Sequence, residues 1–330
     1  MTALKLTLAC GDYDRTRDLA EGVVRPDGID LNYLRLPVEE TFFRMMRHRE
    51  FEVAELSLSS YVVSLLSDPQ PFVALPVFTS RMFRHGSIYL NTGAGISEPA
   101  DLRGKRVGVP EYQLSACVWI RGILADHHGV PVDSVSYHTG GQEQPGRIEK
   151  AGLDLPGNIS VRRIAADKTL SAMLVEGEID AVYTPRIPSP FAKGDPRVGR
   201  LFADVIAAEQ AYFGASGIFP IMHVVALRRD VYDAYPWVAQ SLYKAFLRAK
   251  ASVMDRLYDS SALRFMLPWL NQQLEEAQRV LGDDYWSYGL QANHHVLATF
   301  LRYHHEQGLS RRELRPEELF APESLEAAVI

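Results

Sequence analysis

The pattern of apolar and polar positions in the first third of the chain predicts β-strands separated by helices. Apolar and polar residues alternate over residues 4–8, which predicts a first strand at residues 4–10, and strand-like runs recur over residues 29–33, 51–56, 72–77 and 87–91. Helical periodicity begins at Thr16 and returns over residues 38–49. Strands that alternate with helices are typical of a βαβ fold with a mostly parallel sheet.

The same alternation restarts after a turn at residues 99–104, which indicates a second lobe. Strands are predicted over residues 105–109, 135–138, 159–164 and 179–183. Residues 222–227 are predicted to form a strand that returns the chain to the first lobe. From Pro236 onward the periodicity is mainly helical. We therefore predict lobe I at residues 1–90 and 226–330 and lobe II at residues 91–225.

A chain that leaves one lobe and later re-enters it makes two connections between the lobes. Ligands of open α/β sheets bind beyond the carboxyl ends of the strands. The cleft between the predicted lobes is therefore the expected site, and the loops that directly follow strands are the segments to search.

Composition places the chain among globular proteins that act on small molecules. The 330 residues are 47% hydrophobic and 23% charged, with a net charge of -6, which argues against a general partner of nucleic acid or of acidic membranes. Two cysteines and the lack of an uninterrupted apolar stretch near the N-terminus favour a cytoplasmic protein outside the membrane. The helical C-terminal third leaves a homo-oligomer open.

Several nucleotide and hydrolase motifs are missing from the sequence. It contains no Walker loop, no GxGxxG after a strand, no GxSxG and no HExxH. A nucleotide-dependent enzyme, a serine hydrolase and a zinc protease are therefore disfavoured.

Two charged segments follow predicted strands. Residues 12–17 hold two carboxylates with Arg15 and Arg17, and residues 80–85 hold Arg81, a second arginine and His85. An arginine fork matches a carboxylate, so each segment can clamp an anion. The alternatives are a helix N-terminus with solvated arginines in the first segment and a solvated charged loop in the second.

Other polar groups stand near strand ends. His223 lies in an otherwise apolar strand and is either a proton-transfer group or a hydrogen-bonded core residue. Glu55, Glu111, Glu143 and Arg147 have the same ambiguity between function and ordinary surface charge. Arg186 is a better candidate, because prolines on both sides stiffen its loop.

These segments together resemble 4,5-dihydroxyphthalate decarboxylases. The resemblance covers nearly the whole chain and is carried by residues 11–17, 55–61, 84–85, 104–112, 217–223 and 319–323. It implies an α/β, two-lobed fold similar to type 2 periplasmic binding proteins, with mixed sheets, a central cleft and a helical C-terminal third.

The resemblance also implies a reaction, the loss of one carboxylate from 4,5-dihydroxyphthalate to give protocatechuate and CO2. For this reaction His223 and His85 are the candidates for proton transfer, with Asp12 or Glu55 to orient a histidine. The candidates for substrate binding are Arg15, Arg17, Arg81, Arg186, Ser59, Ser60, Glu111, Tyr112 and Thr184.

Each substrate carboxylate lies para to a hydroxyl, so the ring itself can act as the electron sink. No organic cofactor is then required, although a divalent metal held by the catechol stays open. Two alternatives also stay open: a binding protein for an aromatic or small dicarboxylate, and a lyase or hydrolase that acts on a related aromatic acid.

Overall fold

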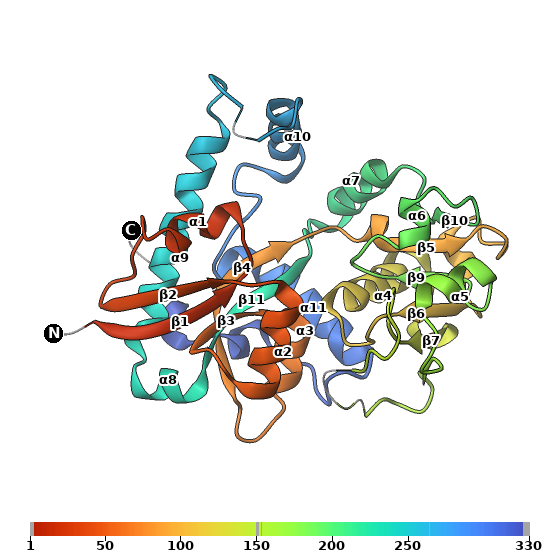
Figure 1. The fold of residues 1–330 in the computed structure, drawn as a ribbon, viewed down its shortest axis with the longest axis horizontal. Coiled ribbons are helices and arrows are strands. Elements are labelled where there is room, and N and C mark those ends of the chain that lie inside the picture. Colours follow the sequence, from red (N-terminus) through yellow and green to blue (C-terminus); the bar gives the residue numbers. More distant parts are fainter. Residues whose placement is uncertain (1–2, 150–151, 153, 264, 326–330) are drawn as a thin grey trace. The chain divides into compact units, whose positions relative to one another are not determined.

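The computed structural model describes residues 3–149, 152, 154–263 and 265–325. By its internal contacts the chain divides into two units (Figure 1). Unit 1 comprises Met1–Arg81, Ile221–Leu297 and Arg315–Ile330, and unit 2 comprises Met82–Pro220 and Ala298–Leu314. Each unit has its own sheet, which contains both parallel and antiparallel strand pairs.

These unit boundaries differ from the predicted lobes. The crossings fall at residues 81/82 and 220/221 instead of 90/91 and 225/226, and Ala298–Leu314 groups with unit 2. Packing explains the C-terminal difference: the rings of Phe300 and Tyr303 lie 5.4 and 5.7 Å from that of Trp119, centroid to centroid. A helical period cannot show which unit covers the apolar face of a helix.

The sheet of unit 1 has the strand order β2-β1-β3-β11-β4. Its strands are β1 (Leu4–Cys10), β2 (Ile29–Arg35), β3 (Val53–Ser57), β4 (Phe72–Arg81) and β11 (Ile221–Arg228). Strand β1 pairs in parallel with β2 and β3, whereas β11 pairs antiparallel with both β3 and β4. The returning strand therefore lies between two strands of the N-terminal segment.

Helices cover this sheet with their apolar faces. Helix α2 (Val38–His48) packs on β3, α3 (Leu58–Ser64) on β11, and α9 (Trp237–Leu257) on both β4 and α1 (Asp14–Ala20). In α2 the buried residues Thr41, Phe42 and Met45 share one face, as helical periodicity requires. Two further α-helices lie wholly in the described part of unit 1, α8 (Arg229–Ala234) and α10 (Leu270–Leu281), and both are shorter than α9.

The sheet of unit 2 has the order β10-β5-β9-β6-β7-β8. Its strands are β5 (Ile88–Asn91), β6 (Arg106–Val109), β7 (Ser136–Thr139), β8 (Ser160–Arg163), β9 (Ala181–Tyr183) and β10 (Val198–Arg200). Its helices are α4 (Ser115–His128), α5 (Leu170–Glu176), α6 (Ser189–Ala192) and α7 (Val205–Ser216). Helix α11 (His294–Glu306) contains the boundary between Leu297 and Ala298.

Three features differ from the predicted elements. Strand β4 continues past the predicted end at residue 77 to Arg81, and Pro76 within it is tolerated because β4 is the last strand of its sheet. Strand β10 has only three residues and gives almost no sequence pattern. Helix α7 was also missed, although Asp204 caps it by accepting a hydrogen bond from the Ala207 amide at 3.0 Å.

Among the described helices, none is both long enough and apolar enough to cross a bilayer.

Candidate active site

A carboxylate and an imidazole meet on the sheet of unit 1. Glu55 in β3 pairs with Val225 in β11, and His223 pairs with Ser57. Since alternate residues of a strand share a face, Glu55 and His223 are diagonal neighbours on one face of the sheet. The Nδ1 atom of His223 lies 2.7 Å from Oε1 of Glu55.

Glu55 is fully buried, and hydrogen-bond donors surround its carboxylate. The Tyr13 hydroxyl and the Thr79 hydroxyl each donate to Oε1 at 2.9 Å, and the Gly11 amide donates to Oε2 at 3.0 Å. Burial alone would raise the pKa of Glu55, but the adjacent His223 and these donors lower it to about 2. Glu55 is therefore ionised at neutral pH and acts as an acceptor.

This arrangement fixes the proton on His223. An ionised carboxylate has no proton to donate, so Nδ1 of the imidazole carries the hydrogen, and Nε2 of the neutral ring is the basic nitrogen. The His223 side chain is 16% exposed, and its ring makes a T-shaped contact with the Phe42 ring at 4.9 Å between centroids. The result is an oriented imidazole with one nitrogen available for proton transfer.

Arg15 lies beside this pair in the loop-to-helix segment after β1. Its Cζ is 4.1 Å from the ring centroid of Tyr13 and 4.4 Å from that of Trp286. Its Nε donates to the Thr79 carbonyl at 2.6 Å, and Nη1 pairs with Asp14 at 3.1 Å. A guanidinium has five N–H donors, so the Nη edge retains donors that can bind a carboxylate.

The other predicted charged residues of unit 1 lie in different surroundings. Arg81 is buried, donates to the Ser287 carbonyl at 2.7 Å and also binds Asn293, and its burial lowers its pKa to about 10. Asp12 is exposed and pairs with Arg35 at 3.6 Å. Arg17 follows Arg15 by two positions on α1, and residues so spaced do not share a helix face.

The predicted serines begin helix α3. Ser59 and Ser60 are both buried, and they follow β3 directly, two and three residues after the strand's last residue. They therefore lie beyond the carboxyl end of a central strand, the position where open α/β sheets bind ligands. The two serines thus follow Glu55 closely in the sequence, and they lie buried in the first turn of α3.

His85 lies in unit 2, in an aromatic environment. Its ring is 5.2 Å from that of Phe202 and 5.1 Å from that of Tyr212, and the residue is 3% exposed. Burial, assisted by His128 and His127, lowers the pKa of His85 to about 4. It is therefore a neutral, buried imidazole at neutral pH. His85 belongs to unit 2, whereas Glu55 and His223 belong to unit 1.

The remaining candidates of unit 2 form two polar clusters. In the first, Thr184 donates to the side chain of Gln142, and Glu143 accepts hydrogen bonds from Ser171 and Ser189 at 2.7 and 2.6 Å. The exposed Arg186 lies next to it, with its amide 3.2 Å from the Thr184 hydroxyl.

The second cluster surrounds the start of α4. Glu111 is buried and pairs with Arg147 at 2.6 Å. The hydroxyl of the buried Tyr112 donates to the Gln307 carbonyl at 3.1 Å, and Gln307 in turn accepts a hydrogen bond from Arg121 at 2.7 Å. Tyr112 therefore helps to anchor Ala298–Leu314 to the rest of unit 2.

Sequence reasoning missed Tyr13, Thr79 and Trp286. Tyr13 lies inside the charged segment 12–17, from which only the charged residues were selected as candidates. Thr79 lies in the part of β4 beyond the predicted end of that strand. Trp286 follows α10 in the C-terminal third, and no local pattern connects it with Arg15. Only the fold brings it there.

Metal ligands do not gather in the described part of the chain. There, no group of three or more histidine, cysteine, aspartate or glutamate side chains is arranged to hold a metal ion.

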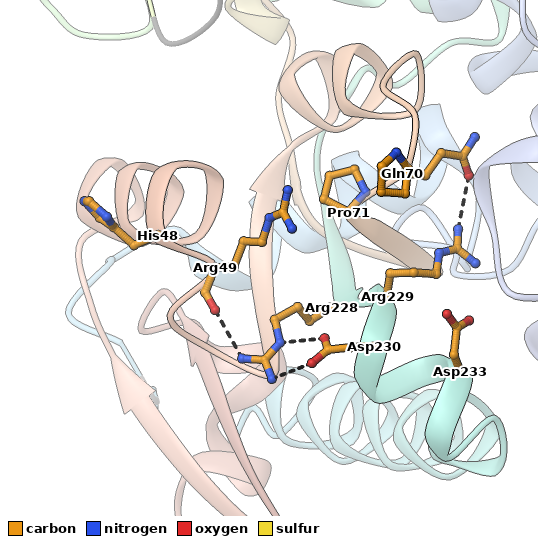
Figure 2. A pocket seen from close by; sticks show the side chains of 9 residues that line it. His48, Arg49, Gln70, Pro71, Arg228, Arg229, Asp230 and Asp233 are labelled. Atoms are coloured by element: carbon orange, nitrogen blue, oxygen red, sulfur yellow. Dashed lines mark hydrogen bonds and ion pairs between the residues drawn. The ribbon is translucent and has the colours of Figure 1, made fainter.

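Figure 2 shows a pocket of about 520 Å³ in unit 1, which is a separate feature. Of its residues, Arg228 ends β11 and Arg229 begins α8, whereas His223 lies near the other end of β11. Five residues along a strand are roughly 17 Å, so this pocket is remote from the imidazole. Its Arg228 is already paired with Asp230 at 2.7 Å, and Arg229 donates to Gln70 at 3.1 Å.

Solved structures that resemble the chain have the periplasmic-binding-protein fold. A periplasmic sulfonate-binding protein from Methylobacillus flagellatus has a TM-score of 0.56 at 12% identity and covers 98% of this chain and 93% of its own. A Candida albicans protein, described as having the generic periplasmic binding protein fold, has a TM-score of 0.54 at 12% identity over 98% of each chain. The predicted α/β fold with mixed sheets, similar to that of periplasmic binding proteins, is thus confirmed.

Curated relatives are much closer in sequence, although no protein-family model matches the chain. A protein of Comamonas testosteroni named 4,5-dihydroxyphthalate decarboxylase is 45% identical over 327 residues, 99% of each chain. A protein of the same name from Pseudomonas putida is 46% identical over 215 residues, which are 65% of this chain and 83% of that one.

Proposed function

Because the chain belongs to the 4,5-dihydroxyphthalate decarboxylase family, we propose that it converts 4,5-dihydroxyphthalate to protocatechuate and CO2 with His223 as its proton-transfer group. The identity extends over 99% of both chains, so the chain is a carboxy-lyase as a whole. The observation that carries the residue assignment is the buried Glu55 carboxylate, 2.7 Å from Nδ1 of His223.

The reaction needs one proton on a ring carbon and the loss of one carboxylate from it. Deprotonation of a phenol raises the electron density at the para carbon, which bears a carboxylate. That carbon takes a proton from solvent, and the bond to the carboxylate then breaks. The electron pair of that bond restores the aromatic ring, CO2 leaves, and the phenolate takes back a proton.

His223 is suited to the phenol steps of this sequence. Its Nε2 accepts the phenol proton at the start and returns it to the product phenolate at the end. A positioned histidine contributes about 10²- to 10⁴-fold to such a proton transfer. The proton on carbon comes from solvent, so the overall reaction consumes one proton per CO2.

Glu55 supports His223 in two ways. Its ionised carboxylate accepts the Nδ1 hydrogen and thereby selects the tautomer with a basic Nε2. Its negative charge also stabilises the imidazolium that forms when the phenol loses its proton. Glu55 itself is saturated with hydrogen bonds and lies buried, so it orients His223 and does not touch the substrate.

Arg15 is the proposed partner of the carboxylate that stays on the ring. Its Nη1 is already paired with Asp14, but the remaining N–H groups of the Nη edge can donate to a carboxylate, and the side chain is 17% exposed. The contacts to Thr79 and Asp14 hold the guanidinium in one orientation. A carboxylate fixed in this way would hold the substrate phenol close to the imidazole, and such positioning lowers the activation free energy of the proton transfer.

The test is a product analysis with the purified chain and 4,5-dihydroxyphthalate, in parallel samples with chelator and with added divalent metal. Equal amounts of CO2 and protocatechuate are expected. Tight binding without either product would instead indicate a binding protein, and release of a different product would indicate another reaction on a related aromatic acid. If CO2 and protocatechuate are released only after metal addition, the reaction also requires a divalent metal bound by the catechol.

A further inference from the structure

The guanidinium of Arg15 is held against two aromatic rings that come from distant parts of the sequence. Tyr13 precedes it by two residues, whereas Trp286 lies in the segment after α10. Both ring centroids are within 4.4 Å of Cζ. A tryptophan face is the best of the aromatic partners for a cation.

Trp286 is itself fixed by the strand that binds Arg15. Its indole Nε1 donates to the Phe78 carbonyl at 2.9 Å, and the next carbonyl of β4, that of Thr79, accepts the hydrogen bond from Nε of Arg15. Two consecutive carbonyls of one strand therefore hold the indole and the guanidinium together. A surface aromatic with an incidental contact would not have such an anchor.

We propose that Trp286 is a positioning residue, which holds the Arg15 guanidinium with its Nη edge ready for the carboxylate of an aromatic dicarboxylate. The inference rests on the proposed function, because it takes Arg15 as the anion-binding group. Stacking uses the face of the guanidinium, so it takes up none of the in-plane N–H donors, and those that Thr79 and Asp14 do not use can bind the anion. Trp286 thus acts on substrate binding through Arg15 without contact to the reacting atoms.

Tyr13 has a different task in the same cluster. Its ring contacts Arg15 at 4.1 Å while its hydroxyl donates to Glu55, so it is tied to both the anion-binding group and the proton-transfer pair. Trp286 has the contact to Arg15 and an anchor to a backbone carbonyl. Loss of the indole is therefore expected to change binding far more than turnover.

The experiment compares Trp286→Phe and Trp286→Leu with the wild-type protein. The probe is phthalate, an aromatic dicarboxylate without the hydroxyls that the reaction needs, and its affinity is measured by calorimetry. Steady-state KM and kcat for 4,5-dihydroxyphthalate are measured separately. Trp269→Phe, which changes an indole that is 68% exposed, is the matched control.

We expect Trp286→Leu to weaken phthalate binding and to raise KM by roughly 10-fold, and Trp286→Phe by roughly 3-fold, because a phenyl ring keeps part of the stacking. The kcat of both should stay within about twofold of wild type, since the proton-transfer groups are untouched. The control should match wild type in both assays.

Wild-type affinity and KM in Trp286→Leu would overturn the inference, and so would a fall in kcat at unchanged KM. Failure of the wild type to bind phthalate would also overturn it. These outcomes are distinct from failure of the proposed function, which is the absence of CO2 and protocatechuate from the wild type whatever the phthalate affinity.

Discussion

Glu55 and His223 are 168 residues apart in the sequence, and an antiparallel strand pair brings their side chains to 2.7 Å. The register of β3 and β11 places them diagonally on one face of the sheet. Hydrogen bonds from Gly11, Tyr13 and Thr79, together with the adjacent His223, keep the buried carboxylate ionised against the effect of its burial. The pair is therefore an oriented base that the strand register holds in place.

Glu55→Gln should lower kcat by roughly 10²- to 10⁴-fold with little change in KM. An amide lacks the charge that stabilises the imidazolium, and its NH2 group can donate to Nδ1 and so favour the wrong tautomer. Steady-state kinetics at neutral pH measure the effect. Glu55→Asp, which keeps the charge on a shorter side chain, should retain more activity than Glu55→Gln, and equal kcat in wild type and Glu55→Gln would contradict this role.

Gly11→Ala should reduce kcat by roughly 10- to 100-fold. A Cβ at Gly11 would lie 2.6 Å from the Tyr13 ring, so the ring would have to move and its hydroxyl would leave Glu55. Small displacements near the reacting groups have effects of this size. Gly214→Ala in α7 is the control, because an added Cβ meets no atom within 4 Å there. If both variants turn over like wild type, the Tyr13 contact is dispensable.

The sequence was sufficient for much of the fold. The predicted strand at residues 4–10 matches β1, and the alternation in the first third gives three further strands of the same sheet. The continuation of β4 from residue 78 to Arg81 was missed, because polar and charged residues begin at Thr79 and are also typical of a loop. The assignment of Ala298–Leu314 depends on packing against Trp119, which no local period encodes.

The site proposed above was among the sequence candidates only in part. Glu55, His223 and Arg15 were selected as charged or polar residues near strand ends, a rule that requires no knowledge of their partners, and their roles stay proposals. The same rule selected His85, which turns out to be buried among aromatic rings, and Asp12, which is exposed beside Arg35. Strand-end position does not say which way a side chain points, and it says nothing of Trp286.

Arg15→Gln should raise KM by roughly 10- to 100-fold, since a hydrogen bond to a charged group is worth about 1.5–3 kcal/mol. The kcat should fall less than KM rises. Arg17→Gln is the matched control on the same helix, because its side chain leaves α1 in another direction. The clamp assignment fails if the Arg15 variant keeps the wild-type KM, or if the two variants behave alike.

His85→Phe should retain decarboxylase activity and change how stability depends on pH. The pKa of His85 is about 4 in the folded protein, whereas an exposed histidine in the unfolded chain has a pKa near ~6.5, so the unfolded state binds the proton first as the pH falls. The contribution to stability is complete above pH ~6.5 and is lost as the pH falls towards 4, by at most about 1.4 kcal/mol per pH unit.

The phenylalanine variant lacks this titration. Urea unfolding at pH 7 and pH 5 should therefore show a larger loss of stability in wild type than in His85→Phe. An identical loss in the two proteins would contradict the buried, neutral state of His85, and loss of activity in the folded variant would return this residue to the candidates for proton transfer.

The most direct test of the account is His223→Asn, assayed for both turnover of 4,5-dihydroxyphthalate and affinity for phthalate. If Nε2 of His223 transfers the phenol proton, kcat falls by about 10²- to 10⁴-fold while the phthalate affinity stays close to that of wild type. A variant that releases CO2 and protocatechuate at the wild-type rate would contradict the assignment of proton transfer to His223.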